Sequence, residues 1–347
     1  MEAVISDMSA LAYWRNHSFD ASGYFLPRNL EPKRRGVPVI DAPSKALADD
    51  IASWTSLDRN DLHLLVNSPG KRRIIHGVTC SVCSAAVPKG SFVRALGTAY
   101  VVAPELLFIQ LARHLSLVEL LRVGYELCGT YRLDGEAPLY GVDPITSVSK
   151  LKSYAQRATD LPGSAKALQA TKWLAEGSGS PAETALAIMF TLPYRYGGYN
   201  LGNPLLNHRI VLNDTAAHIM GRSSMRPDLF WQDAKHPVEY DGPLYHSTRE
   251  QAEYDERRRN AYAAMGMSVT VVTSRHLCNL DLLDEVVAII RKNTGIRQRK
   301  LPASYAIEHY ALFTEVFEYW TALKSEHPDN DEFALMAARY AAPDEPW

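Results

Sequence analysis

The stretch Met225-Arg226-Pro227-Asp228-Leu229-Phe230-Trp231, followed by Pro237-Val238-Glu239-Tyr240-Asp241-Gly242, carries more information than any other part of the chain. It places three carboxylates on two short apolar runs that are joined by a turn at 232–236. A carboxylate in an apolar strand costs free energy unless a partner compensates its charge. Three converging carboxylates also repel one another unless a cation lies between them. Because hard oxygen ligands suit Mg²⁺ or Mn²⁺, the stretch predicts metal-assisted phosphodiester chemistry.

Strand geometry predicts which of these side chains meet. Side chains alternate between the two faces of a strand, so Glu239 and Asp241 share a face while Tyr240 takes the other. If the two runs pair through the turn, Asp228 lies near Glu239, and the carbonyl of Tyr240 becomes an additional metal ligand. The alternative is a surface hairpin with solvated acids, but the apolar neighbours on both runs favour the metal site.

The segments around the motif predict a mixed β-sheet flanked by helices, an α/β (α+β) fold. We expect strands at 207–212, 224–231, 237–241 and 268–273. We expect helices at 182–192, 248–265 and 280–292. The order of helix, three strands, helix, strand and helix is typical of a single sheet covered by helices.

The motif also resembles a known nuclease family. Pro227-Asp228, an eleven-residue step and Glu239-x-Asp241 resemble the PD-(D/E)XK nucleases, and the following Tyr245-His246 resembles their very-short-patch-repair-like branch. The resemblance covers roughly residues 180–293 and includes the order of helices and strands. It implies a restriction-endonuclease-like core and hydrolysis of DNA that depends on Mg²⁺ or Mn²⁺, with Asp228 and Glu239 as metal ligands.

The resemblance also bears on three further residues. The acidic residue that the family carries on its first helix corresponds to Glu183; Ser180-x-x-Glu183 is also a capping box, so both roles stay open. Asp241 stands where the family has a lysine that orients the attacking water. In the very-short-patch-repair-like branch a histidine supplies part of that chemistry, and His246 is the candidate, with helix capping as its alternative.

Basic side chains predict contacts with DNA phosphates. Arg226 precedes the motif aspartate, and Arg257 and Arg258 lie on the helix expected after the motif. The alternative for that helix is a salt-bridged, solvated face. The run Lys71-Arg72-Arg73 lies within residues 62–131, which resemble the middle domain of AbiEi-type antitoxin proteins. That second resemblance implies a defence or toxin–antitoxin setting.

Composition and charge limit the classes of function. The formal net charge is −2, which excludes a uniformly basic nucleic-acid binder. Residues 301–347 contain nine acidic and two basic residues, so the rest of the chain has five excess positive charges. This asymmetry is compatible with DNA as a partner and with a protein partner for the acidic tail. Four cysteines and an acidic start without an apolar leader predict a reduced cytoplasmic setting, and no apolar run is long enough to predict a membrane partner.

A chain of 347 residues exceeds what one core usually serves, so we expect several domains. The expected parts are an N-terminal helical module at 1–60, an AbiEi-like α/β module at 61–132, a linker with helices at 133–179, a nuclease-like domain at 180–300 and an acidic helical tail at 301–347.

Two functions are the leading candidates, and a protein-interaction module whose acidic tail covers the basic body is a third possibility. The first is a metal-dependent DNA endonuclease, which the retained motif acids favour. The second is a non-catalytic DNA-binding regulator or antitoxin that keeps a degenerate nuclease fold, which the missing lysine favours, since fold alone does not decide function.

Overall fold

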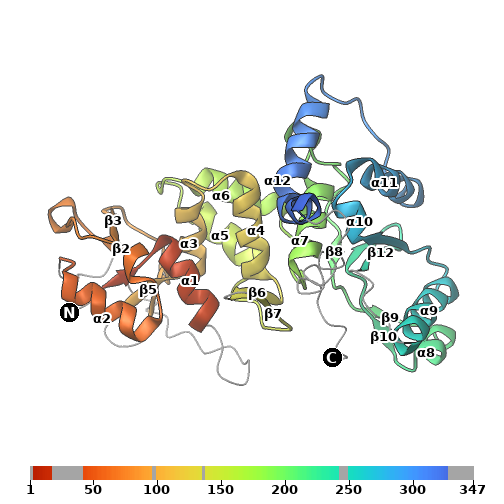
Figure 1. Cartoon of the computed structure of the whole chain (residues 1–347), viewed down its shortest axis with the longest axis horizontal. Helices are drawn as coiled ribbons and strands as arrows, with labels where there is room; N and C mark the ends of the chain where they lie inside the picture. The colour runs from red at the N-terminus through yellow and green to blue at the C-terminus, as the bar shows by residue number, and fades with distance from the viewer. Residues whose placement is uncertain (1–2, 18–41, 96–98, 135–136, 242–248, 327–347) are drawn as a thin grey trace. The chain divides into compact units, whose positions relative to one another are not determined.

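The computed structural model describes residues 3–17, 42–95, 99–134, 137–241 and 249–326 (Figure 1). They belong to two compact units. The first comprises 1–128, 132–134 and 142–172, and the second comprises 129–131, 135–141 and 173–347. The chain combines helices with mixed sheets, which confirms the expected α/β class.

The first unit contains a five-stranded sheet in the order β3-β2-β1-β5-β4. Its central strand is β1 (Val4–Ile5), which pairs antiparallel with β2 (Leu62–Val66) and parallel with β5 (Tyr100–Val102). β3 (Val78–Val82) and β4 (Phe92–Arg94) form the edges. The segment expected to be an N-terminal helical module therefore contributes the middle strand of the sheet to which residues 62–102 belong.

Six helices complete this unit within the described residues. They are α1 (Asp7–His17), α2 (Lys45–Thr55), α3 (Pro104–Leu111), α4 (Leu117–Cys128), α5 (Val148–Arg157) and α6 (Ser164–Ala170). Pro104 occupies the first position of α3, where its missing N–H costs nothing. Every residue of α3 except Glu105 is buried, because α1, α4, α5 and α6 all pack against this helix. Arg15 of α1 binds Glu126 of α4 through two hydrogen bonds, of 2.8 and 2.6 Å.

Shorter elements occur in both units. They are the 3-10 turns η1 (Arg59–Asp61), η2 (Pro69–Lys71), η3 (Thr171–Trp173) and η4 (Tyr194–Tyr196), and the strands β6 (Tyr131–Asp134) and β7 (Ala137–Tyr140). Within the described ranges, no helix is both long and apolar enough to cross a membrane.

The second unit is built on a four-stranded sheet in the order β13-β12-β11-β8. β8 (Leu205–Leu206), β11 (Leu229–Trp231) and β12 (His236–Asp241) are successively antiparallel, and β13 (Thr270–Thr273) runs parallel to β12. The helix α7 (Pro181–Thr191) precedes β8, and α9 (Arg249–Ala264) connects β12 to β13. The sheet elements thus follow one another as helix, three strands, helix and strand, in the order expected from the sequence.

The prediction of the first strand of this sheet at 207–212 is wrong. The strand ends at Leu206, and Asn207 leaves the sheet with a φ of 47°. Asparagine tolerates this left-handed backbone better than most residues. Ile210–Val211 instead forms β9, which pairs with β10 (Ser224–Met225) in a separate two-stranded sheet.

The second expected strand, 224–231, is divided into β10 and β11. Pro227 lies between the two parts, and it has no N–H to donate to a neighbouring strand. The helix α8 (Asp214–Met220), which the sequence analysis missed, lies beside α9 (Figure 1) and starts at the N-cap Asn213. Together β9, β10, α8 and α9 enclose a small core that includes Met220, Met225 and Tyr262.

The hairpin between β11 and β12 has a definite register. Leu229 lies opposite Val238 and Trp231 lies opposite His236, so the turn contains residues 232–235 and is one residue shorter than expected. Lys235 closes this turn with a φ of 51°, and its N–H donates to the carbonyl of Gln232 at 3.0 Å.

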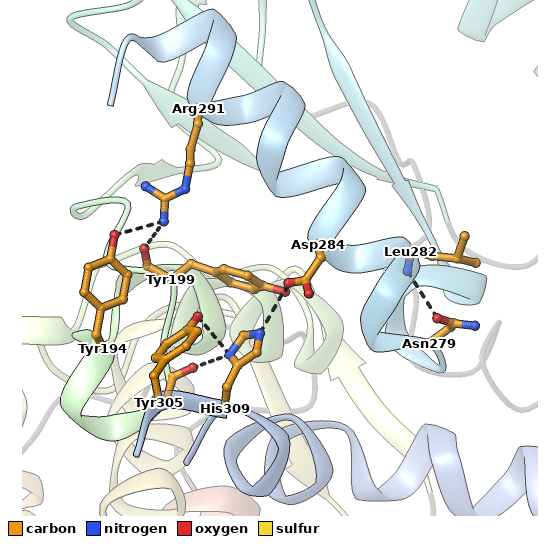
Figure 2. A network of polar contacts seen from close by, with 9 residues as sticks. Tyr194, Tyr199, Asn279, Leu282, Asp284, Arg291, Tyr305 and His309 are labelled. Atoms are coloured by element: carbon orange, nitrogen blue, oxygen red, sulfur yellow. Dashed lines mark hydrogen bonds and ion pairs between the residues drawn. The ribbon is translucent and has the colours of Figure 1, made fainter. Parts of the chain in front are cut away.

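The remaining helices are α10 (Ser274–Leu277), α11 (Leu280–Thr294) and α12 (Tyr305–Glu326). Figure 2 shows the polar network that fixes α12. His309, 5% exposed, has Nδ1 2.5 Å from the carbonyl of Gly197 and Nε2 3.3 Å from Asp284 of α11. Tyr199 donates to the same carboxylate at 2.6 Å, and Arg291 donates to the carbonyl of Tyr199 at 2.5 Å. The network therefore joins α11, α12 and the segment after η4.

Candidate functional site

The register of the hairpin places Asp228 opposite Glu239, next to the paired residues Leu229 and Val238. The backbone N–H of Asp228 donates to Oε2 of Glu239 at 3.4 Å. The backbone N–H of Tyr240 donates to Oδ2 of Asp228 at 2.6 Å. The two motif acids are thus neighbours on adjacent strands, and the backbone of one strand orients the carboxylate of the other.

Glu183 brings a third carboxylate from helix α7. It is 4% exposed and accepts hydrogen bonds from the N–H of Gly179 at 2.8 Å, the hydroxyl of Ser180 at 2.9 Å and the side-chain amide of Asn207 at 2.6 Å. Its own N–H donates to the N-cap Ser180. The first three contacts pull the carboxylate back over the start of the helix, where it also interacts electrostatically with Asp228. These contacts fit the role of Glu183 at the helix start, and its catalytic role stays a prediction.

Two residues of α9 contact Glu239 from the other side. Arg258 donates through Nη2 to Oε2 of Glu239 at 2.6 Å and to the carbonyl of Arg226 at 2.7 Å. Tyr262, one helical turn later, donates its hydroxyl to Oε1 of Glu239. Positions four residues apart lie on the same face of a helix, so both side chains reach the same carboxylate.

Burial and crowding of charge perturb these acids. Burial raises the pKa of Glu239 to about 8, an effect that Arg258 opposes and Asp228 reinforces. Burial raises the pKa of Glu183 to about 8 as well, again with help from the charge of Asp228, while the hydrogen bonds from Gly179 and Ser180 oppose it. Three carboxylates meet one guanidinium, so the ionised cluster lacks positive charge and favours taking up protons or a cation.

The structure gathers a different trio of acids from the one in the motif. Asp241 is the last residue of β12 and is half-buried. The charge that most raises the pKa of Glu239 and of Glu183 is that of Asp228, not that of Asp241. Glu183 takes the third place instead. Tyr240 supplies its N–H to the cluster, and a metal contact through its carbonyl stays a prediction. His246 lies outside the described residues.

The basic residues expected to bind DNA differ in their surroundings. Arg258 points inward to Glu239, with only 16% of its side chain exposed. Arg226 and Arg257 are exposed, and the guanidinium of Arg257 lies 5.8 Å from the ring centre of Tyr254. In the first unit, Arg72 and Arg73 are exposed after η2, while Lys71 is half-buried. Phosphate contacts by these side chains stay predictions.

Two members of the site were not found from the sequence. Tyr262 follows Arg258 by four residues, a spacing that predicts a shared helix face once the helix is accepted. Asn207 was placed in a strand, although asparagine is common where a strand ends in a left-handed turn. Neither signal says that the side chain reaches an acid on another element.

The donor chemistry of the cluster suits a divalent cation, because all the candidate ligands are oxygens and the charge is negative. Across the described residues, however, no group of three or more His, Cys, Asp or Glu side chains is arranged as a set of metal ligands. In this structure Arg258 and Tyr262 occupy the two oxygens of Glu239. The carboxylates of Asp228 and Glu239 have the chemistry and the charge that suit a divalent cation, and a cation bound to them stays a prediction.

Comparison of the chain with protein-family models, with curated proteins and with solved structures gave no match.

Proposed function

We propose that the chain is a metal-dependent DNA endonuclease whose domain at 180–300 has a PD-(D/E)XK core. The observation that carries this proposal is the pairing of Asp228 with Glu239 across β11 and β12, beside the buried Glu183. The order α7, β8, β11, β12, α9, β13 supports it, because it is the order that the resemblance implies.

Each acid has a distinct task in this proposal. Asp228 and Glu239 would hold a Mg²⁺ or Mn²⁺ ion, which when bound lowers the pKa of a water and offsets charge that develops on the phosphate. The N–H of Tyr240 fixes the orientation of the Asp228 carboxylate. Glu183, anchored by Asn207, would add negative charge that favours the cation once its proton is released. His246 remains the candidate for proton transfer.

The substrate would be bound by basic side chains. Arg226 and Arg257 are exposed on the same unit as the acid cluster and would contact phosphates there. We further propose that the AbiEi-like segment with Lys71, Arg72 and Arg73 adds phosphate contacts, and that the protein acts in a defence or toxin–antitoxin setting. The acidic tail at 301–347 is a proposed contact for a protein partner.

The second candidate is a DNA-binding regulator without catalysis. Two observations favour it: Asp241 stands where the family has its lysine, and Arg258 already neutralises Glu239. In that case the cluster would stabilise the fold and the surface arginines would bind DNA.

Plasmid cleavage with Mg²⁺ or Mn²⁺ separates the two candidates. Asp228→Asn keeps an oxygen acceptor for the N–H of Tyr240 but removes the charge, so it should abolish cleavage with little effect on the fold. Asp233→Asn is the matched control, since Asp233 is an exposed acid in the turn of the same hairpin. Cleavage lost in the first variant and kept in the second supports the enzyme. Salt-dependent DNA binding by a wild type that never cleaves supports the regulator.

A further inference from the structure

We propose that Arg258 is an internal counter-ion that keeps Glu239 from binding a divalent cation until DNA draws the arginine away. This inference rests on the proposed function and assigns a regulatory step to the same site. It makes occupation of the site by the cation conditional on the substrate.

The position of Arg258 is the first argument. One nitrogen, Nη2, lies 2.6 Å from the carboxylate of Glu239 on β12 and 2.7 Å from the carbonyl of Arg226, two residues before Asp228. The guanidinium therefore bridges the two chain segments that carry the expected metal ligands. A cation bound to Glu239 would lie close to this guanidinium.

Electrostatics is the second argument. A divalent cation and a guanidinium on one carboxylate repel each other, and the repulsion is stronger in a partly buried site than in water. The side chains of Arg258 and Glu239 are only 16% and 10% exposed, so water screens this repulsion poorly. Binding of the cation therefore requires Arg258 to move away from Glu239.

A DNA phosphate can be the new partner of Arg258 when it leaves Glu239. A guanidinium leaves a buried carboxylate readily only when another anion receives it, and phosphate accepts the same forked pair of hydrogen bonds. Arg257 and Arg259, on either side, are exposed, so this stretch of α9 reaches the surface. Arg258 would then bind a DNA phosphate at the site, and the cation would bind the carboxylate of Glu239. Such an exchange makes the two ligands promote each other's binding.

The test measures Mn²⁺ binding to the full chain by titration calorimetry, without following cleavage. Titrations are run with oxygen excluded at several pH values from 7 to 9, because loss of Arg258, whose charge lowers the pKa of Glu239, lets protons compete with Mn²⁺ in the variant. Arg258→Gln should bind Mn²⁺ at least about tenfold more tightly than the wild type, because the competing charge is gone. Arg259→Gln is the matched control: it removes an exposed arginine from the same helix and should bind like the wild type. Asp228→Asn should lose binding, which locates the ion.

A DNA duplex provides the second arm, measured with Ca²⁺ in place of Mn²⁺ to limit cleavage. A short duplex should tighten cation binding to the wild type and should have a much smaller effect on Arg258→Gln. If that variant fails to fold, as judged by circular dichroism, Arg258→Met keeps the apolar stem and carries the same expectation.

The outcomes distinguish this inference from the proposed function. If Arg258→Gln binds Mn²⁺ no better than a wild type whose binding depends on Asp228, the inference is overturned and the metal site stands. If neither the wild type nor the variant binds Mn²⁺ at millimolar concentration, both the inference and the metal site are overturned. Binding by Arg258→Gln alone supports the inference.

Discussion

Replacement of Glu183 by glutamine removes a buried titratable group while it preserves the hydrogen bonds of the site. The glutamine oxygen can accept from the N–H of Gly179 and from Asn207, as Oε2 of the glutamate does. The glutamine amide can donate to Ser180, whose hydroxyl now donates to Oε1. The variant therefore changes the titration at this position and leaves the shape of the side chain nearly unchanged.

The magnitude follows from the pKa. Burial raises the pKa of Glu183 from 4.5 to about 8, so between these pH values the folded protein holds a proton that the unfolded chain has released. The free energy of unfolding therefore falls as pH rises, by about 1.4 kcal/mol per pH unit for one proton, and levels off above pH 8. The full contribution is about 5 kcal/mol, of which roughly half falls between pH 5.5 and 7.5.

The assay is urea unfolding followed by circular dichroism at pH 5.5, 6.5 and 7.5. The free energy of unfolding of the wild type should fall by about 2 to 3 kcal/mol more than that of Glu183→Gln over this range, because glutamine does not titrate. Titrating groups that do not interact with Glu183 cancel in the difference between the two proteins, whereas Asp228, which does interact with it, does not cancel fully. Glu256→Gln removes an exposed carboxylate from α9 and should keep the wild-type slope. Parallel pH profiles for the wild type and Glu183→Gln would refute the buried, protonated carboxyl.

Further predictions concern α12 and DNA. His309→Ala should lower the free energy of unfolding in urea by about 2 kcal/mol or more, because it leaves the buried carbonyl of Gly197 without its donor; an unchanged midpoint would contradict the network in Figure 2. Gly197→Ala should lower the melting temperature, since a Cβ there would lie 2.1 Å from the carbonyl oxygen of Glu308, and a wild-type melting curve would disprove this close approach. Arg72→Ala combined with Arg73→Ala should weaken DNA binding in fluorescence anisotropy and reduce the slope of log affinity against log salt by about two, one for each phosphate contact. An unchanged slope would remove these arginines from the interface.

Much of the hairpin could be predicted from residues 225–241 alone. Strand side chains alternate with a period of two, and a short turn leaves few registers, so Asp228 had to lie near Glu239. The start of α7 was equally local: Ser180 caps the helix and Pro181 occupies its first position. In each case neighbours in the sequence supply all the interactions that decide the structure.

Strands too short to show an alternation of apolar and polar residues could not be predicted from the sequence. β1 contains only Val4 and Ile5, too few residues to show a period, yet it is the centre of a five-stranded sheet because β2 and β5 pair with it. β8 is equally short, and the sequence predicts a strand at 207–212 instead, where the local preference for a strand is stronger. Pairing between distant segments decided both, and such pairing leaves little trace in a short stretch of sequence.

The sequence by itself determined that two acids face each other on a hairpin, because the period of a strand and the length of a turn are local properties. Only the tertiary structure decided what surrounds them. Glu183, Arg258 and Tyr262 come from two helices that lie before and after the hairpin. Their convergence depends on how those helices pack on the sheet, and packing also determines whether an acid meets water, an arginine or another acid. The charge state of the site, and with it the competition between Arg258 and a cation, follows from that packing.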